Sequence, residues 1–183
     1  AMQIRRWAVA AVVGVVVGGT AVYIWHAQAR PHVRPGTTVS LHGGQVTFRA
    51  PKGWRREACP SGSSGCVDFR PPGGAPGLHG DVLTVIVSTP EPQAPEGDLS
   101  RLLLDPATAG ASAGVSFFTV DGVRFAHMHM DARTMPFEQP AETLVLGVLP
   151  NNDDVFVGCT EQAIPDLVRA GCQQVIDSLH IRA

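Results

Sequence analysis

The strongest constraint on this 183-residue chain is an uncharged apolar run near its start. From Trp7 to Trp25 no position carries Asp, Glu, Lys or Arg. As an α-helix this run would be about 28 Å long, close to the roughly 30 Å hydrocarbon core of a bilayer. Trp7 lies at one end and Tyr23 and Trp25 at the other, where aromatic rings favour the membrane interface. We therefore predict a transmembrane helix over residues 7–25, preceded by a cytoplasmic stub over residues 1–6.

A cleaved secretory signal peptide is the alternative interpretation of the same run. Arg5 and Arg6 form a basic start, and the sequence Ala27-Gln28-Ala29 fits the small-x-small cleavage pattern. The apolar part from Ala8 to Ile24 is, however, longer than the roughly 7 to 15 residues of a typical signal peptide. We favour a retained anchor, and the sequence leaves cleavage open.

All four cysteines, Cys59, Cys66, Cys159 and Cys172, lie after the apolar run and allow three disulfide pairings. We favour the local pairs. Turn-forming small residues separate Cys59 from Cys66, and Cys172 lies on a predicted helix that can fold over the strand ending at Cys159. Zinc is disfavoured because six and twelve intervening residues do not make the paired knuckles of zinc sites. Free buried thiols are the other alternative. Disulfides would place the domain outside the cytoplasm.

The rest of the chain alternates short apolar segments with turns rich in glycine and proline, a pattern typical of antiparallel strands. The clearest hairpin turns at Asp121-Gly122, because both residues tolerate the positive φ that a tight turn requires. We predict hairpins over 39–41 with 46–50, 115–120 with 123–130, and 143–149 with 155–159, and further strands over 67–70 and 81–88.

A C-terminal helix begins near Pro165, a residue suited to the first helical turn. Its apolar residues form one stripe that must be buried against the sheet, namely Leu167, Val168, Cys172, Val175, Ile176 and Leu179. A shorter helix is expected over Leu99–Leu103 after Asp98. We therefore predict an α+β domain over residues 39–183, joined to the membrane helix by a linker over residues 26–38.

Two segments resemble a known family. The run Val46-Thr47-Phe48-Arg49-Ala50-Pro51-Lys52-Gly53-Trp54 and the closing helix, with Cys172 and Val175-Ile176-Asp177-Ser178-Leu179, resemble the Mog1/PsbP-like group of actinobacterial envelope proteins. Within that group, the sequence is most similar to the C-terminal domain of type VII secretion-associated proteins. The resemblance implies an antiparallel sheet flanked by helices and held outside the membrane by one span, and it brings no catalytic residues.

The most suggestive run for metal chemistry is His127-Met128-His129-Met130. On a strand, both imidazoles would share one face and both thioethers the other, and soft copper uses such ligands. We favour an amphipathic strand with the methionines in the core and the histidines at the solvent, because two ligands do not complete a site. We predict no cofactor and no enzymatic activity, since the sequence has no Gly-x-Ser-x-Gly, phosphate-binding glycine loop or His-Glu-x-x-His motif.

Lys52, Arg55 and Arg56 surround Trp54 and form the candidate partner surface, which would meet anionic lipid or an acidic protein. The competing interpretation has Trp54 in the core and its charged neighbours simply solvated.

The charge composition argues against nucleic acid as a partner, because the net charge is −2 and only 16% of residues are charged. We predict a non-catalytic protein of the cytoplasmic membrane, single-pass, with its C-terminal domain outside. It would be an accessory or scaffold component associated with type VII secretion that binds another envelope protein. The alternatives are a module binding lipid or cell-wall material, and a metal-binding envelope protein that uses His127 and His129.

Overall fold

A computed structural model of the chain describes residues 31–59, 65–77, 80–89, 114–131 and 140–182. The chain divides into two units, residues 1–32 and 33–183, and the fold given below is that of the second unit. No helix within the described residues has the length and apolarity needed to cross a bilayer. The predicted membrane helix over residues 7–25 and the short helix over 99–103 lie outside the described residues.

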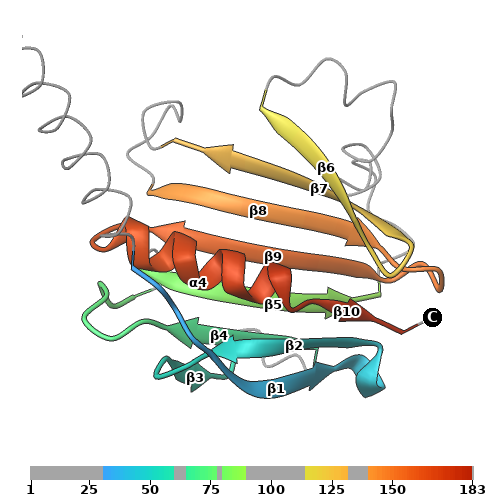
Figure 1. Ribbon diagram of the computed structural model, residues 1–183, viewed down its shortest axis with the longest axis horizontal. Helices are drawn as coiled ribbons and strands as arrows, with labels where there is room; N and C mark the ends of the chain where they lie inside the picture. The colour runs from blue at the N-terminus through green and yellow to red at the C-terminus, as the bar shows by residue number, and fades with distance from the viewer. Residues whose placement is uncertain (1–30, 60–64, 78–79, 90–113, 132–139, 183) are drawn as a thin grey trace, which may run out of the picture. The chain divides into compact units, whose positions relative to one another are not determined.

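The main element of the fold is a seven-stranded sheet in the order β3-β4-β5-β9-β8-β7-β6, with every neighbouring pair antiparallel (Figure 1). All the predicted hairpins and strands of this sheet are confirmed, whereas β3 was not predicted. The strands are β3 (Arg55–Glu57), β4 (Cys66–Arg70), β5 (Val82–Ser88), β6 (Val115–Val120), β7 (Val123–Met130), β8 (Ala141–Val148) and β9 (Asp154–Glu161).

The turn between β6 and β7 has the geometry that its sequence predicts. Asp121 has a φ of 48° and Gly122 a φ of 85°. Positive φ at both central residues is the property of the two-residue turns that match the twist of paired strands. The pair Asp121-Gly122 therefore sets the register in which Val120 faces Val123.

A smaller sheet has the order β1-β2-β10. It contains β1 (Pro35–Leu41), β2 (Val46–Pro51) and β10 (His180–Ile181), and the 3-10 turn η1 (His42–Gly44) connects the first two. The hairpin of β1 and β2 confirms the prediction, but β1 begins at Pro35 rather than at Val39. Residues 35–38, assigned from the sequence to the linker, thus belong to the sheet. The earlier start follows from backbone pairing of Pro35 opposite Pro51, which the side-chain pattern does not reveal.

Helix α4 (Pro165–Asp177) confirms the predicted C-terminal helix and contacts β9, β5 and β8 of the large sheet and β2 of the small one (Figure 1). Its buried face carries Val168, Gly171, Cys172 and Val175. The predicted stripe is therefore correct at its centre, whereas Leu167 and Ile176 are only half-buried at its margins. One apolar core lies between the helix, the small sheet and one face of the large sheet, and includes Val46, Phe48, Phe69, Leu83, Val157 and Val168.

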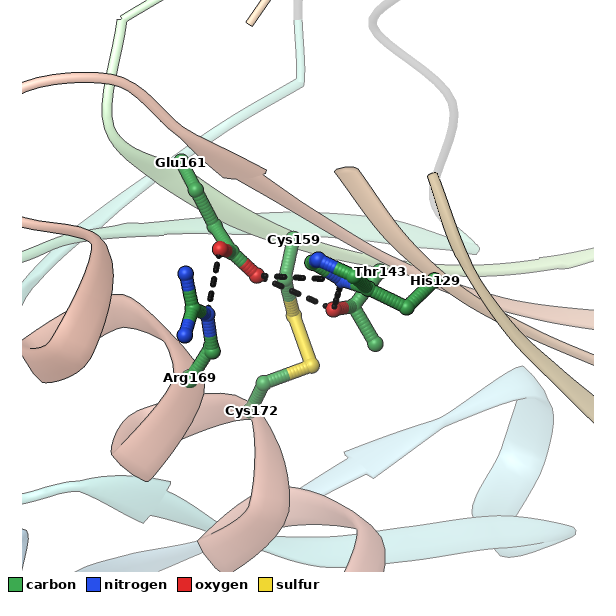
Figure 2. The surroundings of a disulfide bond; sticks show 6 residues. All are labelled: His129, Thr143, Cys159, Glu161, Arg169 and Cys172. Atoms are coloured by element: carbon green, nitrogen blue, oxygen red, sulfur yellow. Dashed lines mark hydrogen bonds and ion pairs between the residues drawn. A yellow bond between two sulfur atoms is a disulfide. The ribbon is translucent and has the colours of Figure 1, made fainter. Parts of the chain in front are cut away.

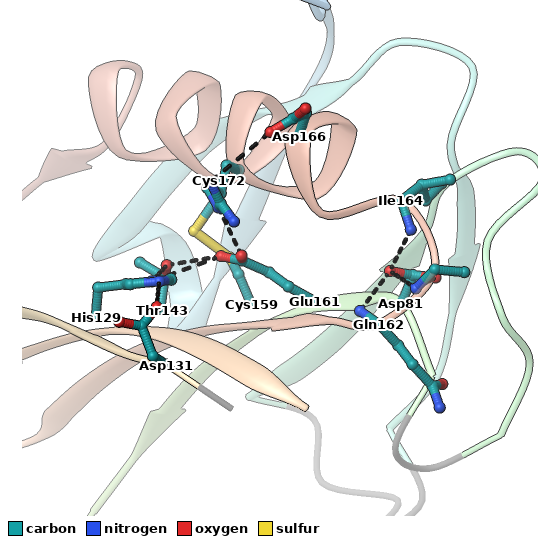
Figure 3. Close-up of polar contacts among 12 residues, drawn as sticks. Asp81, His129, Asp131, Thr143, Cys159, Glu161, Gln162, Ile164, Asp166 and Cys172 are labelled. Carbon is teal, nitrogen blue, oxygen red and sulfur yellow. Dashed lines mark hydrogen bonds and ion pairs between the residues drawn. A yellow bond between two sulfur atoms is a disulfide. The ribbon is translucent and has the colours of Figure 1, made fainter. Parts of the chain in front are cut away.

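A buried carboxylate fixes the connection that leads into α4. Asp81 has no exposed surface and accepts hydrogen bonds from the backbone N–H groups of Ala75, Gln162, Ala163 and Ile164, at 2.8 to 3.3 Å (Figure 3). Burial of this carboxyl acts to raise its pKa, but the four N–H donations outweigh burial and leave the pKa of Asp81 below its usual value. Asp81 therefore joins the loop before β5 to the start of α4 as a charged group.

Candidate functional site

A groove of about 590 Å³ lies where the small sheet meets the β3–β4 end of the large one. Residues 35–39 of β1 form one side, and residues 49–54 at the end of β2 and in the following turn form another. Arg56 of β3 and Phe69 of β4 complete the lining. The groove thus joins segments from four strands, and Figure 1 shows those strands gathered at one end of the fold.

The charged side chains that line this groove are all cations, namely Arg49, Lys52 and Arg56. All three residues are exposed. The side chain of Arg49 donates from Nε to the carbonyl oxygen of Gly36 at 3.3 Å, which holds it along β1. Within the described part of the chain, none of the three forms an ion pair with a carboxylate. No carboxylate of the described segments therefore compensates their charges at short range, and we name these residues with Trp54 the basic groove.

The structure divides the predicted partner surface. Lys52, Trp54 and Arg56 line the basic groove together. Arg55 does not line this groove. Its guanidinium lies 2.5 Å from the Glu57 carboxylate, and Arg55 lines a separate pocket together with Arg70. Glu57 also accepts from Arg70 at 2.8 Å, and this hydrogen bond is the main cause that lowers the pKa of its carboxyl. Arg49 was not predicted as part of this surface, although it lies in the run from Val46 to Trp54 that carries the family resemblance.

Trp54 both packs in the core and lines the groove. The residue is half-buried and contacts the apolar cluster beneath the two sheets. Its six-membered ring lies against the backbone of Gly171 in α4, where a Cβ atom would come within 2.4 Å of the ring. Glycine at this position therefore lets the tryptophan approach the helix closely. Trp54 packs against the core, as the competing sequence interpretation expects, and it also lines the groove.

Substitution of Gly171 by valine is expected to destabilise the domain by roughly 1 to 3 kcal/mol, because the added side chain would displace the rigid Trp54 ring. The displacement should also change the tryptophan fluorescence. Both effects can be measured in one guanidinium titration followed by fluorescence. Ala170→Val is the matched control, since the neighbouring residue lies off the buried face of the helix. An unchanged midpoint for Gly171→Val would contradict the close packing.

A smaller pocket, of about 190 Å³, lies between β7, β8 and α4. His127 and His129 line it with Thr143, Arg169, Cys172, Gln173 and Ile176. The two histidines share a strand face, as predicted, but it is the face of the buried Phe125, which turns toward the helix. The prediction that the methionines lie in the core is wrong, because Met128 and Met130 are only half-buried and the core on this strand is formed by Val123 and Phe125. The prediction of histidines at the solvent holds for His129, which is exposed, whereas His127 is half-buried.

The histidines form no metal site with the side chains described. Neither belongs to a group of three His, Cys, Asp or Glu residues whose ligand atoms lie within 4.8 Å of one another in the described part of the chain. The pKa of His127 is lowered mainly by burial and to a smaller extent by the nearby His129. The His127 imidazole is therefore neutral at neutral pH. The pocket therefore offers two nitrogens but not a complete ligand set.

A polar network lies at the margin of this pocket, beside the disulfide between Cys159 and Cys172 (Figure 2). The Glu161 side chain is fully buried and accepts from Arg169 Nε at 2.6 Å and from the Thr143 hydroxyl at 3.0 Å. The hydrogen bond from Arg169 is the first cause that raises the pKa of its guanidinium. His129 Nδ1 lies 2.9 Å from the Thr143 oxygen, and His129 Nε2 lies 3.2 Å from Asp131. The network thus connects strands β7, β8 and β9 to α4.

The contact of carboxylate, imidazole and hydroxyl resembles a nucleophilic triad only in composition. Thr143 is buried and gives its one hydroxyl proton to Glu161, so His129 Nδ1 must act as the donor toward Thr143. A base that takes a proton from the hydroxyl would need the opposite polarity. We therefore assign this network to the packing of α4 on the sheet.

Both predicted disulfides are present. Cys59 pairs with Cys66, with Cα atoms 5.7 Å apart, and Cys159 pairs with Cys172, with Cα atoms 6.2 Å apart. The second bond joins β9 to α4 across the core, whereas the first joins two residues only seven positions apart.

No family model matches the sequence, and no curated protein matches it. Among solved structures, the solution structure of cyanobacterial PsbP (CyanoP) from Synechocystis sp. PCC 6803 is similar to this chain, with a TM-score of 0.48 and 16% sequence identity. The match covers 80% of this chain and 92% of that one. At this TM-score the likeness carries no conclusion about family or function. The α+β architecture with its C-terminal helix is established by the strands and helix described above.

Proposed function

We propose that this domain is a non-catalytic protein-binding module whose basic groove receives an acidic segment of a partner protein. The observation that carries the proposal is the set of three cations, Arg49, Lys52 and Arg56, around one groove without a carboxylate partner among the described residues. Uncompensated charges of one sign attract a partner of the opposite sign and fix its orientation. Clusters of arginine and lysine are a common means of recognising acidic motifs.

The form of the groove supports a protein segment as the occupant. Strand β1, which forms one side, is an edge strand of the small sheet. Edge strands carry backbone groups that can pair with an added extended chain. Trp54 supplies a large apolar contact beside the cations, and aromatic residues dominate the energetics of many protein interfaces. An acidic extended peptide would thus satisfy charge, backbone and apolar contacts together.

We further propose that the module belongs to the cell envelope and is associated with type VII secretion. The supporting observations are the uncharged run over residues 7–25, the two disulfides, and the resemblance of the run from Val46 to Trp54 to type VII secretion-associated proteins. The anchor would hold the domain on the outer side of the cytoplasmic membrane, where thiols oxidise. The acidic partner would then be a component of the secretion machinery or a protein that it exports.

Reversing two groove charges in the Lys52→Glu/Arg56→Glu variant is expected to weaken partner capture at least about tenfold, because attraction becomes repulsion. The measurement uses full-length chain in its native cells, with a photo-reactive amino acid at Thr38, an exposed residue of the groove. The yield of the crosslinked protein adduct is then quantified.

The control is Arg124→Glu/Arg182→Glu, which reverses the same number of exposed arginines outside the groove lining. It should leave the adduct unchanged, and raising the salt concentration should weaken capture by the unmodified protein. An adduct that survives reversal of the groove charges would refute the proposal. Crosslinks to lipid alone would favour the lipid-binding alternative instead.

A further inference from the structure

The disulfide between Cys59 and Cys66 has a buried carboxylate beside one of its sulfurs. Asp68 is only 6% exposed, and its Oδ1 atom lies 3.5 Å from Cys59 Sγ. The same oxygen accepts a hydrogen bond from the Thr84 hydroxyl at 2.6 Å, across the pairing of β4 with β5. A carboxylate thus sits in a largely dehydrated position at hydrogen-bonding distance from a sulfur atom.

The Asp68 carboxylate can stabilise Cys59 as a thiol but not as part of a disulfide. A sulfur in a disulfide has no proton, so a buried carboxylate gains no hydrogen bond by lying near it and still loses water. If Cys59 carries a proton, the same geometry becomes an S–H···O hydrogen bond to a charged acceptor, which is stronger than one between neutral groups. The side chain of Asp68 is therefore placed to favour the reduced form of Cys59.

The other disulfide lacks this arrangement. Cys159 and Cys172 are 0% and 2% exposed, and neither sulfur has a hydrogen-bonding partner among the described residues. Cys66, by contrast, is half-buried, so the first pair is less enclosed than the second. The ring closed by Cys59 and Cys66 spans only seven positions, against 13 for the other pair, so its closure constrains the unfolded chain less.

We propose that Cys59 and Cys66 form an exchangeable redox pair that is reduced by a protein dithiol, with Asp68 as the positioning residue for the Cys59 thiol. A thiolate of the dithiol attacks Cys66 Sγ, which forms a mixed disulfide and breaks the bond to Cys59. The electron pair passes to Cys59 Sγ, which takes a proton from water and then donates it to Asp68 as a hydrogen bond.

The second thiol of the partner completes the exchange. As its thiolate, it attacks the sulfur of its own chain in the mixed disulfide, which forms the partner's disulfide and releases Cys66 as a thiolate that is protonated by water. The partner dithiol loses two electrons, and the pair of Cys59 and Cys66 gains them. This activity is independent of the basic groove and of the partner proposed for it.

The experiment equilibrates the full oxidised chain with graded ratios of reduced to oxidised dithiothreitol, and measures the thiols of each pair by alkylation and peptide mass spectrometry. Cys59–Cys66 should be reduced at a lower ratio than Cys159–Cys172. Asp68→Asn removes the charged acceptor and should make Cys59–Cys66 about fivefold harder to reduce, while Cys159–Cys172 is unchanged.

Thr84→Val provides the second variant, because it keeps the carboxylate and removes the competing donor. The oxygen of Asp68 would then be freer for the Cys59 thiol, so reduction should become easier, in the direction opposite to Asp68→Asn. Easier reduction in both variants would indicate a general loosening of the fold and would count against Asp68 as the positioning residue. Equal reduction of the two disulfides in the unmodified chain, or no change in both variants, would overturn the proposal.

Discussion

Replacing Asp81 with alanine is expected to lower the free energy of unfolding by about 3 kcal/mol. Four backbone N–H groups, from Ala75 and residues 162–164, would lose their acceptor at once. Hydrogen bonds to charged groups contribute more than neutral ones, and a buried donor left without an acceptor costs about 1–3 kcal/mol. The loss should be measured from guanidinium unfolding curves at neutral pH. Asp177→Ala is the control, because that carboxylate lies on the exposed side of α4 and, within the described part of the chain, accepts a hydrogen bond from Gln173 alone.

The same carboxylate predicts how stability depends on pH. The pKa of Asp81 is lower in the folded protein than its ordinary value of 3.8, so folding favours the charged form. Its contribution is fully present above about pH 4 and is lost as the pH falls through the folded pKa. The unmodified protein should lose stability steeply in that range, and Asp81→Asn should show a shallower loss from a lower starting value. Equal acid slopes for the two proteins would contradict this assignment.

Removing the disulfide between β9 and α4, in the Cys159→Ala/Cys172→Ala variant, is expected to cost roughly 3 to 5 kcal/mol. Constraint of the unfolded chain accounts for about 3 kcal/mol of this, for a ring of this length. The remainder comes from the empty space left by the sulfurs of two residues that are 0% and 2% exposed. Unfolding by guanidinium without reductant measures the change.

The matched comparison is Cys59→Ala/Cys66→Ala, which removes the other disulfide. Its ring is shorter, so the chain-entropy loss is about 2.5 kcal/mol, and Cys66 is only half-buried. The domain should therefore tolerate loss of this bond better. If the two double variants have equal midpoints, the bond between β9 and α4 has no special role in stability.

Local patterns predicted the elements that are long enough to show a period. The Asp121-Gly122 turn and the apolar stripe of α4 are readable because both depend on neighbours within a few residues. Strands β3 and β10 were missed because the three residues of Arg55–Glu57 and the two of His180–Ile181 are too short to alternate visibly. The edge of β1 at Pro35 was missed because it depends on backbone pairing alone.

The sites depended on contacts between distant residues, which the sequence does not encode locally. Lys52, Trp54 and Arg56 were found because they are neighbours in sequence. Arg49 lies on β2, where its side chain reaches the carbonyl oxygen of Gly36 on the paired strand β1, a contact that the sequence pattern does not show. Asp81 reaches donors 81 to 83 positions away. Its role follows from the placement of β5 beside β9, which no periodicity in the chain predicts.

Strand β10 closes the small sheet by pairing His180 with Thr47 and Ile181 with Val46. Strand β2, near the beginning of the domain, therefore pairs with a strand that is synthesised more than a hundred residues later. Pairing between segments so distant in sequence is slow to form. As synthesis proceeds from the N-terminus, the hairpin of β1 and β2 emerges early and keeps one flank of β2 unpaired until the last turn of α4 follows. During that interval the unpaired backbone N–H and C=O groups along one edge of β2 can bind chaperones or other copies of the chain.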